Sequence, residues 1–229
     1  MTITFAHRGG RADLAENTLP AFERALAHGA TGLETDAWCT GDKKVALVHD
    51  QTRWVLRARF IPWKINIGKS SAQQLARFEI PTLDDLYSTV GIDYELSIDC
   101  KEPAVSDLIV EVARRHGASE RLWLCDYSTT RLKQLRKKFP EVNLVNSKPK
   151  RKVASTMERH AADLSDAGID AMNMHQSEWT PGLVTLFHRF KVKVFAWDVQ
   201  EVRHLRAMLA LGADAVYCDH VDRMVDVIA

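Results

Sequence analysis

The chain has 229 residues, 46% of them hydrophobic, and its 31 basic side chains nearly balance its 30 acidic ones. A chain of this length can bury a sizeable core as one domain, and α/β barrels of this length are common. The balanced charge argues against nucleic acid as a partner, because no large basic field is available. An anionic ligand must therefore be bound by a local site.

The sequence also bears on compartment and redox state. No unbroken apolar stretch is long enough to cross a bilayer, and Met1 to Phe5 shows no signal-peptide pattern. We therefore expect a cytoplasmic protein without stable membrane insertion. The four cysteines lie far apart in or beside apolar runs, so we expect reduced thiols at strand positions.

Short β-rich runs alternate with longer amphipathic runs, the pattern of repeated βα units around a parallel sheet. Nine strands are expected: Ile3–Ala6, Gly32–Ala37, Val45–Val48, Glu95–Cys100, Arg121–Cys125, Val142–Val145, Ala171–Met174, Val192–Trp197 and Ala215–Cys218. The second and third are joined only by Cys39–Lys44, so they form either a hairpin or two separate units.

Helices are expected between the strands. One begins after Asn17 or Thr18 and ends before Gly29. The others are Thr82–Val90, Ala104–His116, Thr129–Lys138, Lys152–Ala167, Pro181–Phe190 and Gln200–Leu211. We interpret residues 1–229 as a single α/β domain with the fold of a TIM-type (β/α)8 barrel.

Residues 51–80 form a short insertion with weak periodicity after the third strand. Among its basic and aromatic residues are Arg53, Arg57, Arg59, Lys64, Lys69, Arg77, Trp54, Phe60 and Trp63. One interpretation is a lid or specificity loop that meets an anionic head group. The other is that the aromatic rings cover the barrel edge while the charges are merely solvated.

Polar side chains end the first four apolar strands, and the active site of a βα barrel lies at the carboxyl ends of its strands. These side chains are His7, Arg8, Glu34, Asp36, His49, Asp99 and Lys101. Because strand residues two apart share a face, Glu34 points the same way as Asp36 and Asp99 the same way as Lys101. His7 and Arg8 are adjacent, but Gly9 and Gly10 let the chain bend so that both can reach one phosphate.

The residue types in this group indicate a reaction. The carboxylates of Glu34, Asp36 and Asp99 would repel one another without a cation, and an all-oxygen set suits Mg²⁺ or Ca²⁺ better than zinc. Arg8 and Lys101 supply positive charge for an anion. Two histidines, His7 and His49, can serve as an acid and a base near neutral pH. One divalent cation, a phosphate site, an acid and a base together indicate phosphodiester chemistry.

The motifs "AHRGG", "ENTLPAF", "GATGLETDAW", "VALVHD", "ELSIDCK", "FAWDVQ" and "GADAVYCD" occur in the order and near the spacing of a known family. Over nearly its whole length the chain resembles the glycerophosphodiester phosphodiesterase family, of the phosphatidylinositol-phospholipase-C-like phosphodiesterase superfamily. The resemblance implies a TIM-type barrel that hydrolyses glycerophosphodiesters to glycerol 3-phosphate and an alcohol with one divalent cation. The expected partner is therefore a small-molecule glycerophosphodiester.

The resemblance also implies roles by position. His7 and His49 correspond to the general base and acid, and Arg8 and Lys101 to phosphate-side cations. Glu34 and Asp36 correspond to metal ligands, Trp197 to a pocket tryptophan, and Glu16 with Asn17 to the loop that supports the His7 end. The family usually has Glu where this chain has Asp99, which implies a metal held through water or more weakly. His175 and Trp179 are expected to line the pocket or to be structural.

Two alternatives remain at this point. In the first, the same site cleaves a lysophospholipid or an inositol phosphodiester, and the insertion contacts lipid. In the second, the barrel binds a phosphodiester without cleaving it, an interpretation that rests on the departure of Asp99 from the family pattern.

Overall fold

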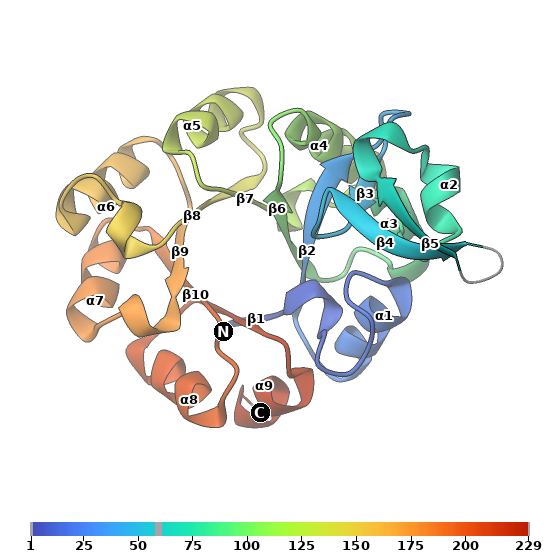
Figure 1. Ribbon diagram of the computed structural model, residues 1–229. Helices are drawn as coiled ribbons and strands as arrows, with labels where there is room; N and C mark the ends of the chain where they lie inside the picture. Colours follow the sequence, from blue (N-terminus) through green and yellow to red (C-terminus); the bar gives the residue numbers. More distant parts are fainter. Residues whose placement is uncertain (1, 58–60, 229) are drawn as a thin grey trace.

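The computed structural model describes residues 2–57 and 61–228 and shows a closed barrel of eight parallel strands surrounded by helices (Figure 1). The strands, in order around the barrel, are β1 (Ile3–Ala6), β2 (Gly32–Cys39), β6 (Glu95–Cys100), β7 (Leu122–Asp126), β8 (Asn143–Ser147), β9 (Ala171–His175), β10 (Lys193–Trp197) and β11 (Ala215–Cys218). β1 pairs with both β11 and β2, and these pairings close the barrel. The expected TIM-type fold is confirmed.

The ninth expected strand lies outside the barrel. β3 (Val45–Leu47) runs antiparallel to β2, with Ala37 opposite Leu47 and Cys39 opposite Val45. The hairpin interpretation of this pair is therefore correct, and the parallel barrel keeps eight strands. Since β3 returns toward the middle of β2, it brings the residues that follow it back toward Asp36, whose carbonyl accepts the Val48 amide.

Helices cover the outside of the barrel. They are α1 (Leu19–Ala27), α3 (Leu83–Val90), α4 (Val105–His116), α5 (Thr129–Lys138), α6 (Met157–Asp166), α7 (Pro181–Arg189), α8 (Val202–Leu211) and α9 (Val221–Ile228). α6 is shorter than expected because a separate 3-10 turn, Lys150–Lys152, precedes it, and α9 was not expected from the sequence. Thr18 occupies the N-cap position of α1, but its hydroxyl donates to the Ala15 carbonyl instead of accepting from the helix.

Apolar residues pack on both sides of the barrel wall. Leu33, Leu96, Ile98 and Cys100 belong to the large cluster between strands and helices, as the alternation of strand side chains predicts. A second cluster fills the barrel interior with Phe5, Trp123, Cys125, Val145, Ala171, Phe195, Ala215 and Tyr217. This packed interior closes the barrel below the polar strand ends, so the functional side chains stand on a rigid floor.

The insertion contains two strands and a short helix, which the weak periodicity of its sequence did not indicate. β4 (Thr52–Arg57) and β5 (Ile61–Asn66) form an antiparallel hairpin, followed by α2 (Ala72–Ala76), which begins with a capping box at Ser71. Val55 and Ile65 pack into a cluster that also contains Ile67, Leu75, Ile80, Ala46 and Val48, with Trp38 against it. Apolar residues occur on both faces of the hairpin, so the sequence lacks a clean alternation.

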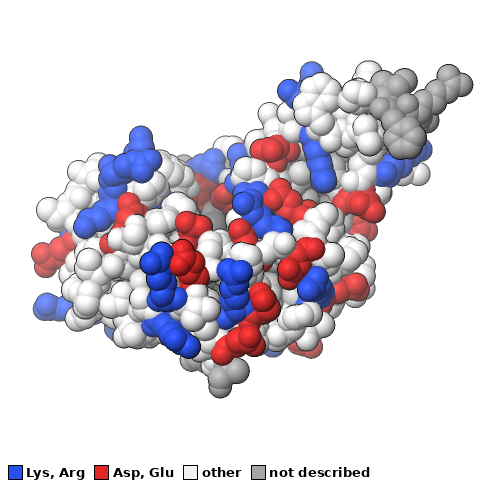
Figure 2. All heavy atoms as spheres, turned by 60° about the horizontal axis from the view of Figure 1, so that its bottom comes forward, with Lys and Arg blue, Asp and Glu red and all other residues white. Residues whose placement is uncertain are grey.

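The basic and aromatic residues of the insertion do not share one environment. Trp54 is 68% exposed, so its ring does not cover the barrel edge, whereas Trp63 lies opposite Val55 on the face that packs toward the barrel and is 48% exposed. Arg59 and Phe60 lie outside the described residues. In Figure 2 the described part of the hairpin stands out at the upper right, with blue basic side chains beside uncharged surface.

Within residues 2–57 and 61–228, every helix is too short or too polar to cross a bilayer. All four cysteines are unpaired and buried, and each lies in a barrel strand.

Candidate active site

A cavity of about 410 Å³ opens at the carboxyl ends of the barrel strands. All eight residues expected in the site line it: His7, Arg8, Glu34, Asp36, His49, Asp99, Lys101 and Trp197. Arg11, Ser97, Cys125, Ser147, Asn173, Asp198, Gln200, Tyr217 and Asp219 complete the lining. The structure therefore brings together side chains from the loops and ends of most barrel strands.

The turn after β1 directs two adjacent side chains into this cavity. The chain enters a 3-10 turn at His7, and Arg8, Gly9 and Gly10 all have positive φ, at 50°, 80° and 83°. A Cβ on Gly10 would lie 2.6 Å from a methyl group of Val221, and one on Gly9 would lie 2.9 Å from the Cβ of Ala21. The two glycines are thus required for space as well as for conformation.

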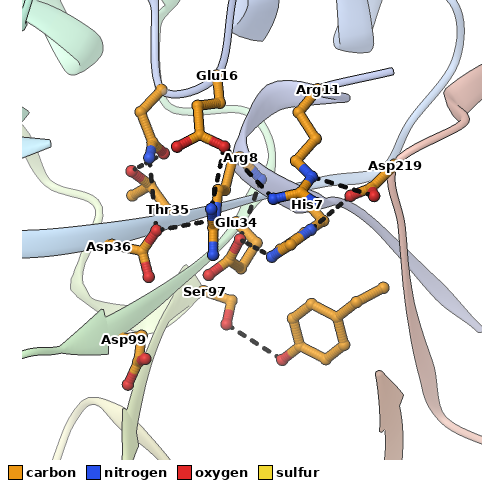
Figure 3. A network of polar contacts seen from close by, with 12 residues as sticks. His7, Arg8, Arg11, Glu16, Glu34, Thr35, Asp36, Ser97, Asp99 and Asp219 are labelled. Carbon is orange, nitrogen blue, oxygen red and sulfur yellow. Dashed lines mark hydrogen bonds and ion pairs between the residues drawn. The ribbon is translucent and has the colours of Figure 1, made fainter. Parts of the chain in front are cut away.

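His7 is held by a carboxylate on the opposite end of the chain (Figure 3). Its Nδ1 lies 2.5 Å from Oδ1 of Asp219, and its Nε2 lies 3.8 Å from Oε2 of Glu34. Burial alone would lower the pKa of His7, but Glu34 and the hydrogen bond with Asp219 outweigh it and raise that pKa. The Nδ1 contact fixes the ring and leaves Nε2 directed toward the carboxylates.

Arg8 is surrounded by acidic side chains. Its Nη1 donates to Glu16 at 3.0 Å, and its Nε lies 3.2 Å from Oδ2 of Asp36. Its backbone amide donates to Oε2 of Glu34 at 3.0 Å. These contacts fix the guanidinium at the wall of the cavity beside His7, as Figure 3 shows.

The loop that contains Glu16 and Asn17 supports this end of the barrel. The Asn17 amide donates to the Arg8 carbonyl at 2.9 Å, which ties the loop to the turn after β1. The Asn17 side chain accepts a hydrogen bond from Thr35 at 2.8 Å and lies 3.4 Å from Oδ2 of Asp36. This side chain is buried, so it orients β2 at the point where Asp36 enters the cavity.

The carboxyl group of Glu34 is buried, and its neighbours offset only part of the cost of burying its charge. Glu34 is 7% exposed. Burial, with further contributions from Asp36 and Asp99, raises the pKa of Glu34 to about 7, although nearby His7 and the Arg8 amide act in the opposite direction. Near neutral pH this group therefore carries a charge that the surrounding protein only partly stabilises.

Lys101 joins the other two carboxylates. Its Nζ lies 2.8 Å from Oδ1 of Asp36 and 2.5 Å from Oδ2 of Asp99. Burial would lower the pKa of Lys101, but the two aspartates outweigh it and raise that pKa, so the side chain is cationic. Asp99 thus lies on the cavity face expected from the strand alternation.

His49 lies at the more open side of the cavity. Its side chain is 36% exposed, and its Nδ1 is 2.9 Å from Oδ1 of Asp50. The indole Nε1 of Trp38 donates to the His49 carbonyl at 3.0 Å. Since Trp38 lies on β2 two residues beyond Asp36, this bond fixes His49 relative to the carboxylates on β2.

The far wall of the cavity is aromatic and polar. Trp197 ends β10 and packs edge-on against His175, with ring centroids 4.6 Å apart. Nε2 of His175 lies 3.1 Å from Oδ2 of Asp198, so His175 supports the rim without lining the cavity. Trp179 is 5% exposed, packs on Phe187 and is part of the core, so the structural interpretation of this residue is correct.

Asn173 contributes an unpaired hydrogen-bond acceptor, its Oδ1 atom, to the same wall of the cavity. It is 5% exposed, and its Nδ2 donates to Ser147 at 3.1 Å, while its Oδ1 is buried without a hydrogen-bond partner. A buried acceptor of this kind is costly unless a ligand supplies a donor. Asn173 is therefore suited to accept a hydrogen bond from a ligand hydroxyl.

The lining also has an excess of negative charge. It includes five Asp or Glu side chains but three Arg or Lys side chains, a surplus of two acidic groups. An anionic ligand would be repelled by such a cavity unless a cation accompanied it. The carboxyl oxygens of Glu34, Asp36 and Asp99 fit a hard divalent cation by donor type.

The present arrangement does not preform such a site. Among the residues that the structure describes, no three His, Cys, Asp or Glu side chains are gathered closely enough to hold a metal ion. Instead of a metal ion, Lys101 lies between Asp36 and Asp99 and neutralises their charge.

Two residues of the cavity wall were not among the site residues expected from the sequence. Asp219 directly follows β11, so the rule that collects polar residues at strand ends would have found it had it been extended to the last strand. Asn173 lies inside β9, and its role depends on an unsatisfied oxygen that only the packed structure reveals.

Comparisons with known proteins agree with this geometry. The model of the glycerophosphoryl diester phosphodiesterase family matches residues 7–223. A glycerophosphodiester phosphodiesterase of Caldanaerobacter subterraneus subsp. tengcongensis is 23% identical over 246 residues, which cover 99% of this chain and 98% of that protein. The crystal structure of a glycerophosphodiester phosphodiesterase from Thermotoga maritima has a TM-score of 0.84 at 22% identity, covering 99% of this chain and 98% of that one.

A phosphodiesterase from Oleispira antarctica, solved in complex with the product sn-glycerol-3-phosphate, has a TM-score of 0.81 at 21% identity, covering 98% of this chain and 96% of that one. The solved structures show the shared fold, and the family model spans most of the chain, from His7 past Asp219. The chain belongs to the glycerophosphoryl diester phosphodiesterase family.

Proposed function

We propose that this protein hydrolyses glycerophosphodiesters to sn-glycerol 3-phosphate and an alcohol, using His7 and His49 for proton transfer. The observation that carries the proposal is the single cavity in which both histidines face Arg8, Lys101 and three carboxylates. Family membership supports the reaction class, and a fold neighbour that holds sn-glycerol-3-phosphate supports the product.

His7 is the better placed of the two histidines to act as general base. Its Nδ1 is occupied by Asp219, so its Nε2 is the nitrogen free to take a proton from the attacking hydroxyl. That hydroxyl belongs either to the glycerol moiety or to water. Asp219 stabilises the imidazolium that forms, since it lies 2.5 Å from the ring and its lowered pKa, to which His7 and Arg11 contribute against the effect of burial, keeps it ionised.

His49 is the better placed to act as general acid. Its ring lies at the more exposed side of the cavity, where an alcohol of variable size has room to leave. Donation of a proton to the leaving oxygen avoids the release of an unstable alkoxide. Arg8 and Lys101 contribute positive charge toward the phosphate, and Asn173 accepts a hydrogen bond from a glycerol hydroxyl.

We further propose that one divalent cation, Mg²⁺ or Ca²⁺, completes the site. Glu34, Asp36 and Asp99 would hold it, and Lys101 would then turn from the aspartates toward the phosphate. When bound, such an ion polarises a phosphate oxygen and increases the acidity of a nearby hydroxyl. The surplus of two acidic groups in the cavity lining supports this proposal.

Release of sn-glycerol 3-phosphate from glycerophosphocholine tests the function directly. Purified protein would be assayed after treatment with EDTA and again with Mg²⁺ or Ca²⁺ restored. We expect release that requires metal and falls by at least about 100-fold in His7→Ala and in His49→Ala. His28→Ala is the matched control, because His28 is exposed, does not line the cavity, and has its ring hydrogen-bonded to the Arg24 carbonyl of the preceding helix.

Two results would contradict the proposal in different ways. Equal activity of wild type, His7→Ala and His49→Ala would place the chemistry elsewhere. Binding of glycerophosphocholine in a calorimeter without any product would instead support a barrel that binds phosphodiesters without cleaving them.

A further inference from the structure

The outer face of the β4–β5 hairpin is an exposed apolar surface. In this antiparallel pair Trp54 lies opposite Lys64 and Leu56 lies opposite Pro62, so these four side chains share one face. Trp54 is 68% exposed and Leu56 is 62% exposed, and Pro62 and Lys64 are exposed as well. Among the described residues, Trp54 and Leu56 are the two most exposed large hydrophobic side chains.

The inner face of the same hairpin is anchored to the barrel. Val55 and Ile65 alternate with the exposed residues, are 9% and 7% exposed, and pack into the cluster beneath the insertion. In the isolated protein, apolar side chains that stay exposed to water on such a strand contribute nothing to the stability of the fold. Exposed apolar patches of this kind mark binding surfaces. The outer face is thus presented in a fixed orientation, not by a loose loop.

The charge of this segment indicates what it binds. From Gln51 to Lys69 the sequence contains five basic residues and no acidic residue, although the chain as a whole has 31 basic and 30 acidic side chains. Of these basic residues, Arg53, Arg57 and Lys64 belong to β4 or β5, and Lys64 shares the outer face with Trp54. In Figure 2 the described part of the hairpin shows blue side chains beside uncharged surface.

Tryptophan with basic residues is the composition that favours a lipid–water interface. The indole ring is stabilised at the head-group level of a bilayer, and each Lys or Arg near an anionic leaflet adds attraction to it. A second copy of this chain fits less well, because two hairpins of the same positive charge would repel each other when packed face to face.

We propose that the outer face of the β4–β5 hairpin docks this protein onto the surface of an anionic phospholipid membrane. Trp54 and Leu56 enter the head-group region, and Lys64, which shares their face, contacts lipid phosphates. β4 begins three residues after His49, so docking holds the rim of the cavity near the membrane surface. Binding of this kind is peripheral and requires no spanning helix.

Vesicle flotation tests the proposal with the full chain. Binding would be compared on vesicles of phosphatidylcholine alone and of phosphatidylcholine with phosphatidylglycerol, at low and high salt. We expect the protein to float with the anionic vesicles at low salt and to dissociate as salt rises, because exposed charges are screened. The double variant Trp54→Ser with Leu56→Ser should bind at least about tenfold more weakly.

Charge and folding controls keep the test decisive. Lys64→Glu should weaken binding to anionic vesicles about tenfold or more, since it removes one attraction and adds a repulsion, whereas Lys133→Glu on α5 should not. Tyr127→Ser, which removes an aromatic ring that is 52% exposed elsewhere, should also leave binding unchanged. Thermal unfolding and hydrolysis of soluble glycerophosphocholine report whether each variant is folded, independently of lipid binding.

Three outcomes would overturn the proposal. Wild-type protein that stays unbound to anionic vesicles at low salt would contradict it, as would equal binding by the Trp54→Ser, Leu56→Ser variant. A mass that doubles with protein concentration in sedimentation, and that this variant reduces to a monomer without any vesicle binding, would assign the face to self-association.

Discussion

Replacement of Glu34 by glutamine is expected to stabilise the metal-free protein above neutral pH while abolishing its activity. Burial is the main reason that the pKa of Glu34 rises from 4.5 to about 7, and Asp36 adds to it. A carboxyl with a raised pKa binds its proton more tightly in the folded state than in the unfolded state. Stability is therefore lost as pH rises from about 4.5 through about 7.

The size of this loss follows from the two pKa values. A difference of one unit between the pKa in the folded state and the pKa in the unfolded state corresponds to about 1.4 kcal/mol. Ionisation of Glu34 therefore lowers the free energy of unfolding by about 3 kcal/mol above pH 7. Glutamine has nearly the same shape, accepts the Arg8 amide and stays neutral. The gain is at most about 3 kcal/mol, because the variant also loses the attraction between Glu34 and protonated His7.

Denaturant unfolding of wild type and Glu34→Gln in EDTA, at pH 4 and pH 8, measures the effect. The variant should be more stable by up to about 3 kcal/mol at pH 8, or roughly 6–12 °C in Tm, with little difference at pH 4. Mg²⁺ or Ca²⁺ should raise the Tm of wild type more than that of the variant. A variant that is less stable than wild type at pH 8, or a difference that does not change with pH, would refute this reasoning.

Further predictions concern the other parts of the site. Asp219→Asn should lower kcat at least about tenfold with little change in KM, because it removes the carboxylate that orients His7 and stabilises its protonated form; a changed KM at constant kcat would contradict this. Asn173→Ala should raise KM for glycerophosphocholine but not for a diester without glycerol hydroxyls, as steady-state kinetics would show. Gly10→Ala should lower the free energy of unfolding by about 1–3 kcal/mol more than Gly117→Ala, measured in urea. Gly117 has a similar φ of 71° but open space around it, so equal losses would refute the clash.

Much of the site follows from two local rules. The alternation of side chains along a strand places Glu34 with Asp36, and the barrel rule places strand ends in one cavity. Both depend only on residue order, so they also identified His7, His49 and Asp99. They cannot show that Lys101 bridges two aspartates, since that depends on how strands β2 and β6 pair.

The insertion shows where local pattern fails. Trp54 and Leu56 alternate with Val55, yet apolar residues on both faces hide the strand period from sequence inspection. The inner face is identified only by what it packs against, namely Trp38 and the cluster under the hairpin. An exposed apolar face reflects binding and not folding, so folding rules do not predict it.

The roles of the two histidines are tested most directly by how each variant depends on the leaving group. kcat/KM would be compared for glycerophosphocholine and for the p-nitrophenyl diester of glycerol phosphate, in wild type, His7→Ala and His49→Ala. A p-nitrophenolate leaves without a proton, so His49→Ala should lose about 10²–10⁴-fold on glycerophosphocholine but less than about tenfold on the p-nitrophenyl diester, whereas His7→Ala should lose activity on both. Equal losses of His49→Ala on the two substrates would contradict the assignment of His49 as general acid.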